Sequence, residues 1–207
     1  MWKAILSPDF FSTILRSATP ILFATLASAI AAKSGICNMA LEGIMLFSAL
    51  FGVIFSSLTN SAWLGLLITM VIGGLIGMIL AFFILILKTD EILAAIAINL
   101  TATGGTVLIM VAFSGDRGVS SSIRSVSAPT VTLPLIEKIP FIGSVLSGQN
   151  VLTWLAILAV ILLHLFLYKT TLGLAIRAVG ENKNAVESVG ISSRKIKYIA
   201  LIISGVL

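Results

Sequence analysis

The chain has 207 residues, of which 58% are hydrophobic and 10% are charged, and 13 basic residues against 8 acidic ones give a formal net charge of +5. Soluble domains carry about 25% charged residues, more than twice the share in this chain, and the mean hydropathy here is +1.16. Together these values exclude a soluble enzyme, a disordered chain and a disulfide scaffold. Residues 43–87, 92–115 and 139–168 contain no Asp, Glu, Lys or Arg, and each run is longer than the ~20 apolar residues that cross a bilayer. This predicts a polytopic membrane protein, an all-α bundle in a single transmembrane domain over residues 1–207.

The predicted elements begin with a short interfacial helix within residues 1–16, where apolar residues recur at helical spacing. Hydropathy then predicts five membrane spans, at residues 17–32, 39–58, 62–87, 92–113 and 151–168. Trp154 and Tyr168 lie near the ends of the fifth, as interfacial anchors do. Residues 199–207 begin a sixth span, but nine residues rise only about 13 Å of the ~30 Å of hydrocarbon. We therefore expect the chain to be a truncated part of a longer protein.

Two connections decide the predicted orientation. Residues 169–198 are rich in Lys and Arg, which places them in the cytoplasm by the positive-inside tendency. Residues 114–150, with three prolines, are then an ordered extracytoplasmic cap with a short helix. Counting spans back puts the amino terminus outside, which conflicts with Lys3 and Arg16. Either that weaker signal loses, or residues 33–38 form a broken or re-entrant segment that changes the parity.

Polar residues inside the predicted spans are candidates for function, because they are costly in lipid. Glu42 is either a pathway or gate residue or a first-turn acid at a helix amino terminus that Asn38 caps. Asn99 and Thr101 lie in the middle of the fourth span and bind either a neighbouring helix or a passing polar ligand. We interpret His164 as an interior imidazole with a satisfied hydrogen bond, and not as a metal or proton site.

Other residues predict packing or exclude chemistry. Gly73, Gly74 and Gly77 have a small-xxx-small spacing that allows close helix contact. With one Cys, Cys37, and one His, the sequence has no metal-ligand spacing, no phosphate-binding glycine loop and no catalytic constellation. We predict that the chain is not an enzyme and, because its basic residues are explained by topology, that it binds no nucleic acid.

The basic loop predicts a docking element. Gly180 ends one helical piece, Asn182 or Asn184 caps the next, and Gly190 ends it in the left-handed conformation. Ser192 or Ser193 then caps a helix that enters the membrane. Ala185, Val186 and Val189 are expected on one side of the short middle helix, rimmed by charge, which favours a protein-docking surface over an ordinary solvated loop.

The residues GLAIRAVGEN at 173–182, together with residues 185–191, resemble the coupling segment of permease subunits in ABC-type importers of the nucleoside, simple-sugar and branched-chain amino acid branch. The residues SGICNMALEGIML at 34–46 are similar to the nucleoside-type members, which favour Asn-Ile-Gly-Leu-Glu-Gly, although Met39 and Ala40 depart from that pattern. Asp90-Glu91-Ile92 followed by Asn99-Leu100 is also similar to the pattern of these permeases.

The resemblance implies a multi-pass subunit of the bacterial cytoplasmic membrane that moves a nucleoside by alternating access. It implies ATPase subunits that bind ATP and Mg, a sister permease or second copy, an extracytoplasmic substrate-binding protein or lipoprotein, and no cofactor in this chain. The residues expected to couple the subunit to the ATPase are Gly173, Arg177, Gly180, Glu181, Asn182, Ala185 and Gly190. The candidates for the substrate pathway are Glu42, Asn99 and Thr101.

Three alternatives remain open at this point. The same class of importer would serve a simple sugar such as ribose or galactose, since no residue separates a sugar from a nucleoside. A gradient-driven secondary transporter would use Glu42 as its coupling carboxylate, but it leaves the docking-type loop unexplained. An assembly protein without transport would leave the intramembrane polar residues unexplained.

Overall fold

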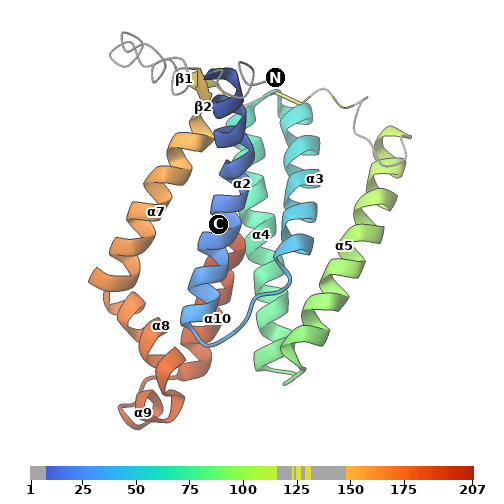
Figure 1. Ribbon diagram of the computed structural model, residues 1–207. Coiled ribbons are helices and arrows are strands. Elements are labelled where there is room, and N and C mark those ends of the chain that lie inside the picture. Colours follow the sequence, from blue (N-terminus) through green and yellow to red (C-terminus); the bar gives the residue numbers. More distant parts are fainter. Residues whose placement is uncertain (1–7, 116–122, 124, 127–128, 132–147) are drawn as a thin grey trace.

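The computed structural model is a helical bundle (Figure 1), and it describes residues 8–115, 123, 125–126, 129–131 and 148–207. The elements are α2 (Pro8–Lys33), α3 (Leu41–Thr59), α4 (Ala62–Leu85), α5 (Glu91–Ser114), β1 (Thr130–Val131), β2 (Gln149–Asn150), α7 (Val151–Lys169), α8 (Thr171–Glu181), α9 (Lys183–Ser188) and α10 (Ser193–Val206).

Five of the described helices, α2, α3, α4, α5 and α7, are long and apolar enough to cross a membrane. The last four agree with the predicted spans to within two residues at each end. The membrane-spanning helical fold predicted from hydropathy is therefore confirmed.

The first span is longer than predicted, because α2 begins at Pro8 and continues without a break through Pro20. Residues 8–16 are thus the first turns of a membrane helix, and the separate interfacial helix expected there is wrong for these residues; residues 1–7 lie outside the described part. Proline at a helix start loses no hydrogen bond. Proline inside a membrane helix is tolerated because neighbouring groups satisfy the backbone.

The helices of the bundle pack around α4 and α10, which make the most extensive contact, with α3 also lying along α4. α5 packs mainly on α3, while α2 lies against α10 and α7. The α4–α10 contact depends on Gly73, Gly77 and Gly205, where an added Cβ would overlap backbone of the facing helix. The packing role predicted for this glycine group is confirmed.

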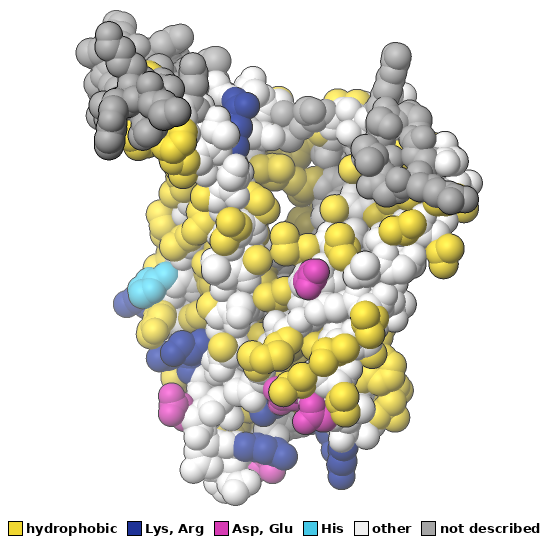
Figure 2. All heavy atoms as spheres, turned by 45° about the vertical axis from the view of Figure 1, so that its right-hand side comes forward, with side chains coloured by type: hydrophobic (Ala, Val, Ile, Leu, Met, Phe, Trp, Pro, Cys, Tyr) yellow, Lys and Arg dark blue, Asp and Glu magenta, His cyan; other side chains and the backbone are white. Residues whose placement is uncertain are grey.

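The two ends of the bundle differ in character. At one end, β1 pairs with β2 in an antiparallel two-stranded sheet, with Thr130 opposite Asn150. Most of the predicted extracytoplasmic cap, including its short helix, lies outside the described residues. At the other end are α8 and α9 (Figure 1), and Figure 2 shows most of the charged side chains of its view gathered there, with hydrophobic side chains covering the flank above.

The direction of α2 shows on which side of the bundle the first span begins. Arg16 near its start donates to the Gly148 carbonyl at 3.0 Å, and its last residue, Lys33, lies against Gly180 at the end of α8. α2 therefore starts at the β-strand end and finishes at the α8–α9 end, so the segment after Lys33 does not change the parity. If residues 169–198 are cytoplasmic, α2 starts outside, where Arg16 forms a structural hydrogen bond.

Candidate functional site

Residues 169–198 fold into a defined unit, which we call the coupling unit and which consists of α8, α9 and the first turns of α10. Thr170 Oγ1 accepts a hydrogen bond from the Gly173 amide at 3.0 Å at the start of α8. Asn182 Oδ1 accepts one from the Ala185 amide at 3.1 Å at the start of α9. Of the two asparagines predicted as caps, Asn182 is the one. Gly190 follows with φ +85°, which confirms the left-handed end.

A hydrophobic core holds the coupling unit to the bundle. It joins residues of α2, α7, α8, α9 and α10, which are Ile30, Leu163, Leu167, Ile176, Val179, Val186, Ile196 and Ala200. Val186 is buried to 7% exposure, whereas Ala185 is exposed and Val189 is 77% exposed. The expectation that all three share an outer face is therefore wrong for Val186, which anchors α9. The exposed apolar tip consists of Val189 and Ile191.

Arg177 binds α8 to the end of α7. Its Nε donates to the Leu167 carbonyl at 3.0 Å, and its Cζ lies 4.5 Å from the centre of the Tyr168 ring, in cation–π geometry. The other ring contact of Tyr168 is with His164, at 4.7 Å between centroids. His164 is exposed on α7, so its interpretation as an interior imidazole is wrong. The hydropathy of α7 is nearly uniform around the helix and gave no sign of which face is outward.

The other predicted coupling residues divide into close backbone contacts and exposed side chains. A Cβ at Gly173 would overlap the Phe166 carbonyl oxygen, and one at Gly180 would overlap the Lys33 carbonyl oxygen. Glu181 is exposed and has no ion-pair partner in the described part of the chain. Sequence reasoning did not single out Glu187, which lies 3.9 Å from Lys183 and accepts a hydrogen bond from the Ser193 hydroxyl.

Between α2 and α3 the helical structure is interrupted over residues 34–40, a segment that we call the break. The backbone turns at Gly35, where φ is +76°. Asn38 is buried; its Oδ1 accepts from the Ala40 amide at 3.1 Å, and its Nδ2 donates to Ser204 Oγ at 2.9 Å. The N-cap of α3 is Ala40, without a side-chain cap, so Asn38 is not the cap that the sequence predicted. Its side chain instead joins the break to α10.

Asn99 fixes the start of α3 to the middle of α5. Its Oδ1 accepts from the Gly43 amide at 2.8 Å and its Nδ2 donates to the Met39 carbonyl at 3.0 Å. Gly43 is required there, since a Cβ would lie 2.8 Å from Asn99 Oδ1. Asn99 comes eight residues after the start of α5, a rise of about 12 Å. The α3 helix therefore begins well inside the membrane span.

The three pathway candidates do not share one environment. Glu42 is exposed in the first turn of α3 and has no ion-pair partner among residues that the structure describes. Asn99 Oδ1 accepts from a backbone amide and Asn99 Nδ2 donates to a backbone carbonyl. Thr101 donates to the Ala97 carbonyl of its own helix at 2.7 Å, and two residues along a helix turn it about 200° away from Asn99. Glu42 is the candidate whose polar group is free of such bonds in the described part.

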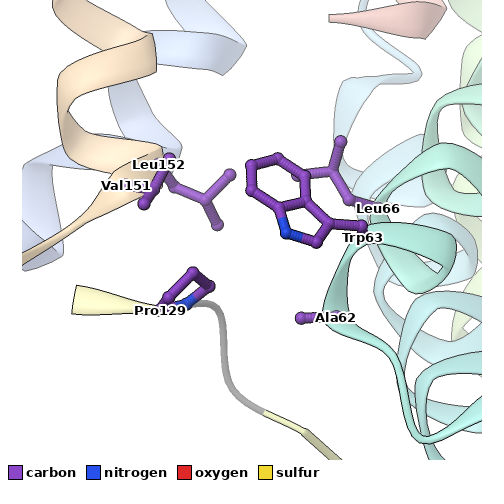
Figure 3. A pocket seen from close by; sticks show the side chains of 6 residues that line it. All are labelled: Ala62, Trp63, Leu66, Pro129, Val151 and Leu152. Carbon is purple, nitrogen blue, oxygen red and sulfur yellow. The ribbon is translucent and has the colours of Figure 1, made fainter. Parts of the chain in front are cut away.

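Two cavities lie at opposite ends of the bundle. A small crevice at the β-strand end is lined by Ala62, Trp63, Leu66, Pro129, Val151 and Leu152; in Figure 3 the Trp63 ring of α4 faces Leu152 of α7. A larger, open pocket of about 500 Å³ lies beside the break and is lined by Cys37, Met39, Ile84, Lys88, Thr89, Asp90, Glu91 and Ile92. The described residues contain no group of three His, Cys, Asp or Glu side chains placed to hold a metal ion.

Comparison with known proteins identifies relatives over most of the chain. It is 31% identical over 195 residues to a putative glucose ABC transporter permease protein of Haloferax volcanii, covering 92% of this chain and 57% of that protein. It is 31% identical to the nucleoside ABC transporter permease protein NupC of Lactococcus lactis, covering 95% and 63%. The guanosine ABC transporter permease protein NupQ of Bacillus subtilis is also 31% identical, with 91% and 60% covered. No solved structure matches.

The chain spans about three fifths of the length of these relatives. The family model described as a branched-chain amino acid transport system permease component matches residues 10–207, which include all five spans and the coupling unit. This chain therefore belongs to the family of multi-pass membrane permease components of branched-chain amino acid type ABC transport systems.

Proposed function

We propose that the chain forms part of the transmembrane subunit of an ATP-driven importer for nucleosides, which works by alternating access. The observation that carries the proposal is the coupling unit, a folded three-helix element at the basic end of a membrane bundle. Its exposed apolar tip, Val189 and Ile191, follows a helix of only six residues. An exposed apolar tip of this kind is typical of a docking surface.

The charges around the tip define the chemistry of the partner. Lys183, Arg194 and Lys195 are exposed near it, while Glu187 is paired with Lys183 and Ser193. A complementary surface is an apolar pocket with an acidic rim. We propose that a separate ATPase subunit supplies this pocket and binds the ATP and Mg.

Movement of the ATPase subunits would then be passed to the helices that the coupling unit contacts. Arg177 and the buried core fix the unit to α7, α2 and α10, so it moves with these helices and not as a free loop. A sister permease or second copy completes the translocation path, and an extracytoplasmic binding protein delivers the substrate. Under this proposal Glu42 is a pathway residue, because its carboxylate is exposed at the start of a helix that begins inside the membrane span. Asn99 holds the start of α3 in place, and Thr101 lies on the part of α5 that lines the path.

The nucleoside assignment is supported by the names of two of the relatives above and by the residues 34–46. A simple sugar is the second candidate, supported by the relative that is named as a putative glucose permease. Uptake of radiolabelled nucleosides and of glucose by cells with and without the complete permease separates the two. Uptake that survives ATP depletion and stops with a protonophore would contradict the importer and favour a gradient-driven transporter.

Co-purification tests the docking surface directly. The complete permease is expressed with its genomic neighbours, and the ATPase subunit that it retains in detergent is measured for the wild type, Val189→Asp and Glu181→Lys. Val189→Asp should lose most of the ATPase, because it places a charge in the apolar contact, whereas Glu181→Lys adds a positive charge facing an acidic rim and should retain it. The control is Leu58→Asp, which changes a 64% exposed leucine near the end of α3 remote from the coupling unit. Equal retention in all variants would contradict docking on this surface.

A further inference from the structure

The break between α2 and α3 is a non-helical segment with turns at residues 34–35 and 39–40. Burial alternates along it: Ser34, Ile36, Asn38 and Ala40 are buried, and the residues between them are exposed. The buried residues face the elements that pack around the break, and the residues between them face outward. Its position is therefore set by the elements that contact it.

The coupling unit contacts the first half of the break. Gly180, the second-last residue of α8, lies so close to the Lys33 carbonyl and the Gly35 amide that no side chain fits. Gly35 is also within reach of Lys197, on the second turn of α10. Backbone against backbone leaves no flexible side chain to absorb a displacement, so the end of α8 and the break are in rigid contact.

α10 holds the second half of the break. Ser204 Oγ accepts from Asn38 Nδ2 at 2.9 Å and donates to the Ala27 carbonyl at 2.7 Å, and both Asn38 and Ser204 are buried. The break is joined to α5 through Glu91, which accepts from the Cys37 amide at 3.0 Å. Directly after these bonds α3 begins, with Glu42 in its first turn.

The two contacts belong to one body. Asn182 links α8 to α9 through its bond to the Ala185 amide, and the Glu187–Ser193 hydrogen bond links α9 to α10. A displacement of α9 is therefore transmitted to the break in two ways, through the contact of Gly180 and through α10.

We propose that the break is the relay between the coupling unit and the membrane-embedded start of α3, and that Gly180, Asn38 and Ser204 are positioning residues for this transfer. The proposal rests on the proposed function. Displacement of α9 by an ATPase shifts residues 34–40, which moves the first turn of α3 and the Glu42 carboxylate. The relay is a contiguous set of packed and hydrogen-bonded groups, the physical form in which such coupling travels.

Cys37, the single cysteine of the sequence, lies exposed in the break and reports its movement. The complete importer is reconstituted in nanodiscs with all other cysteines replaced, and the rate at which a maleimide labels Cys37 is measured without nucleotide and after trapping with ATP and vanadate. We expect the rate to change about threefold or more on trapping, as for couplings of ordinary size.

Two variants interrupt the two routes. Gly180→Ala should abolish the change in labelling rate, because its Cβ forces Lys33 away from α8. Ser204→Ala removes only a hydroxyl group and should reduce the change to less than half while the ATPase is still retained and active. Gly104→Ala is the matched control, since an added Cβ there meets nothing within 4 Å, and it should respond as the wild type does.

Each outcome decides a different point. A wild-type rate that is indifferent to trapping, in an importer that hydrolyses ATP and transports, overturns the relay and leaves the proposed function intact. Unchanged responses in both variants likewise overturn it. Absence of any bound ATPase overturns the proposed function, and the relay falls with it.

Discussion

Asn99 makes both of its amide hydrogen bonds to the backbone at the start of α3. A helix that begins inside a membrane exposes amide groups that water cannot reach. An asparagine from the neighbouring helix solves this problem for Gly43, and a glycine is needed at 43 for the close approach. Of the two uses that the sequence left open for Asn99, a contact with a neighbouring helix or with a polar ligand, the structure shows the contact with a neighbouring helix.

Replacing Asn99 by leucine should lower the free energy of unfolding by about 1–2 kcal/mol, because the Gly43 amide and the Met39 carbonyl lose their partners. Thermal or steric-trap unfolding of the complete permease in detergent measures the loss. Thr101→Val is the control, since the Thr101 hydroxyl bonds only within its own helix, and it should change stability by much less. Equal losses in the two variants would contradict a structural role for Asn99.

Among the helices, the α4–α10 contact shows the greatest demand for small residues. Gly73 and Gly205 face each other, and Gly77 lies one turn along α4 against the Leu201 carbonyl. Apolar side chains give little driving force for association in lipid, so close backbone packing takes its place. This contact links α10, and with it the coupling unit, to the centre of the bundle.

Gly73→Ala should destabilise the permease by about 1–3 kcal/mol, the usual cost of overpacking, because its Cβ would overlap the Gly205 carbonyl. The shift in thermal midpoint of the purified protein measures it. Gly104→Ala makes the same change where there is open space and should leave the midpoint nearly unchanged. A midpoint for Gly73→Ala equal to that of this control would show that α4 and α10 are not packed this closely.

The cap of α9 allows a sharper test at the same scale. Asn182→Ala removes the bond to the Ala185 amide and should weaken α9 by about 1 kcal/mol, which is seen as hydrogen exchange of the Ala185 and Val186 amides that is roughly fivefold faster. Asn184→Ala, which changes the other asparagine of the same helix, should have little effect. If Asn184→Ala has the larger effect, the cap is assigned to the wrong residue.

Over the whole molecule, one asymmetry relates the bundle to the membrane. The coupling unit carries Arg194, Lys195 and Lys197 at one end, while α3 ends and α4 begins at the other. Basic residues are retained on the cytoplasmic side, so we predict that this end of the bundle faces the cytoplasm. Arg16 does not oppose it, because its guanidinium is bonded to Gly148.

Labelling of introduced cysteines tests this orientation in a Cys37→Ser background. Leu58→Cys should react with a membrane-impermeant maleimide in intact cells, or in spheroplasts where an outer membrane is present. Val189→Cys should react only after the membrane is made permeable, although it is the more exposed position, at 77% against 64%. The reverse pattern would place the coupling unit outside and end the proposal that it docks on an ATPase.

Much of the fold was predictable because hydropathy and capping are local properties. The ends of α3, α4, α5 and α7 follow from where charged and polar residues interrupt apolar runs. Gly190 was identifiable from backbone preferences alone, and so was an asparagine cap at 182 or 184, of which the structure shows Asn182. The start of α2 was not, since residues 10–15 are apolar enough for both an interfacial and a spanning helix.

Which side chains of a helix are buried and which are exposed was not predictable from the sequence, and the candidate site depends on this. Both lipid and protein interior are apolar, so a membrane helix has no polar stripe that marks its outer side. For this reason the exposure of His164 on α7 was missed. The burial of Val186 was missed because α9 has only six residues, too few for a periodic pattern to show which face packs on the bundle.

The class of protein, four of its five spans and the motif of the coupling unit follow from composition and from neighbours along the chain. The contacts of Asn38 with Ser204, of Asn99 with Gly43 and of Gly180 with Lys33 came only from the folded chain. Asn38 and Ser204 are 166 residues apart in the sequence, and Gly43 and Asn99 are 56 residues apart. A contact over that separation is set by how the helices pack, which no local pattern encodes.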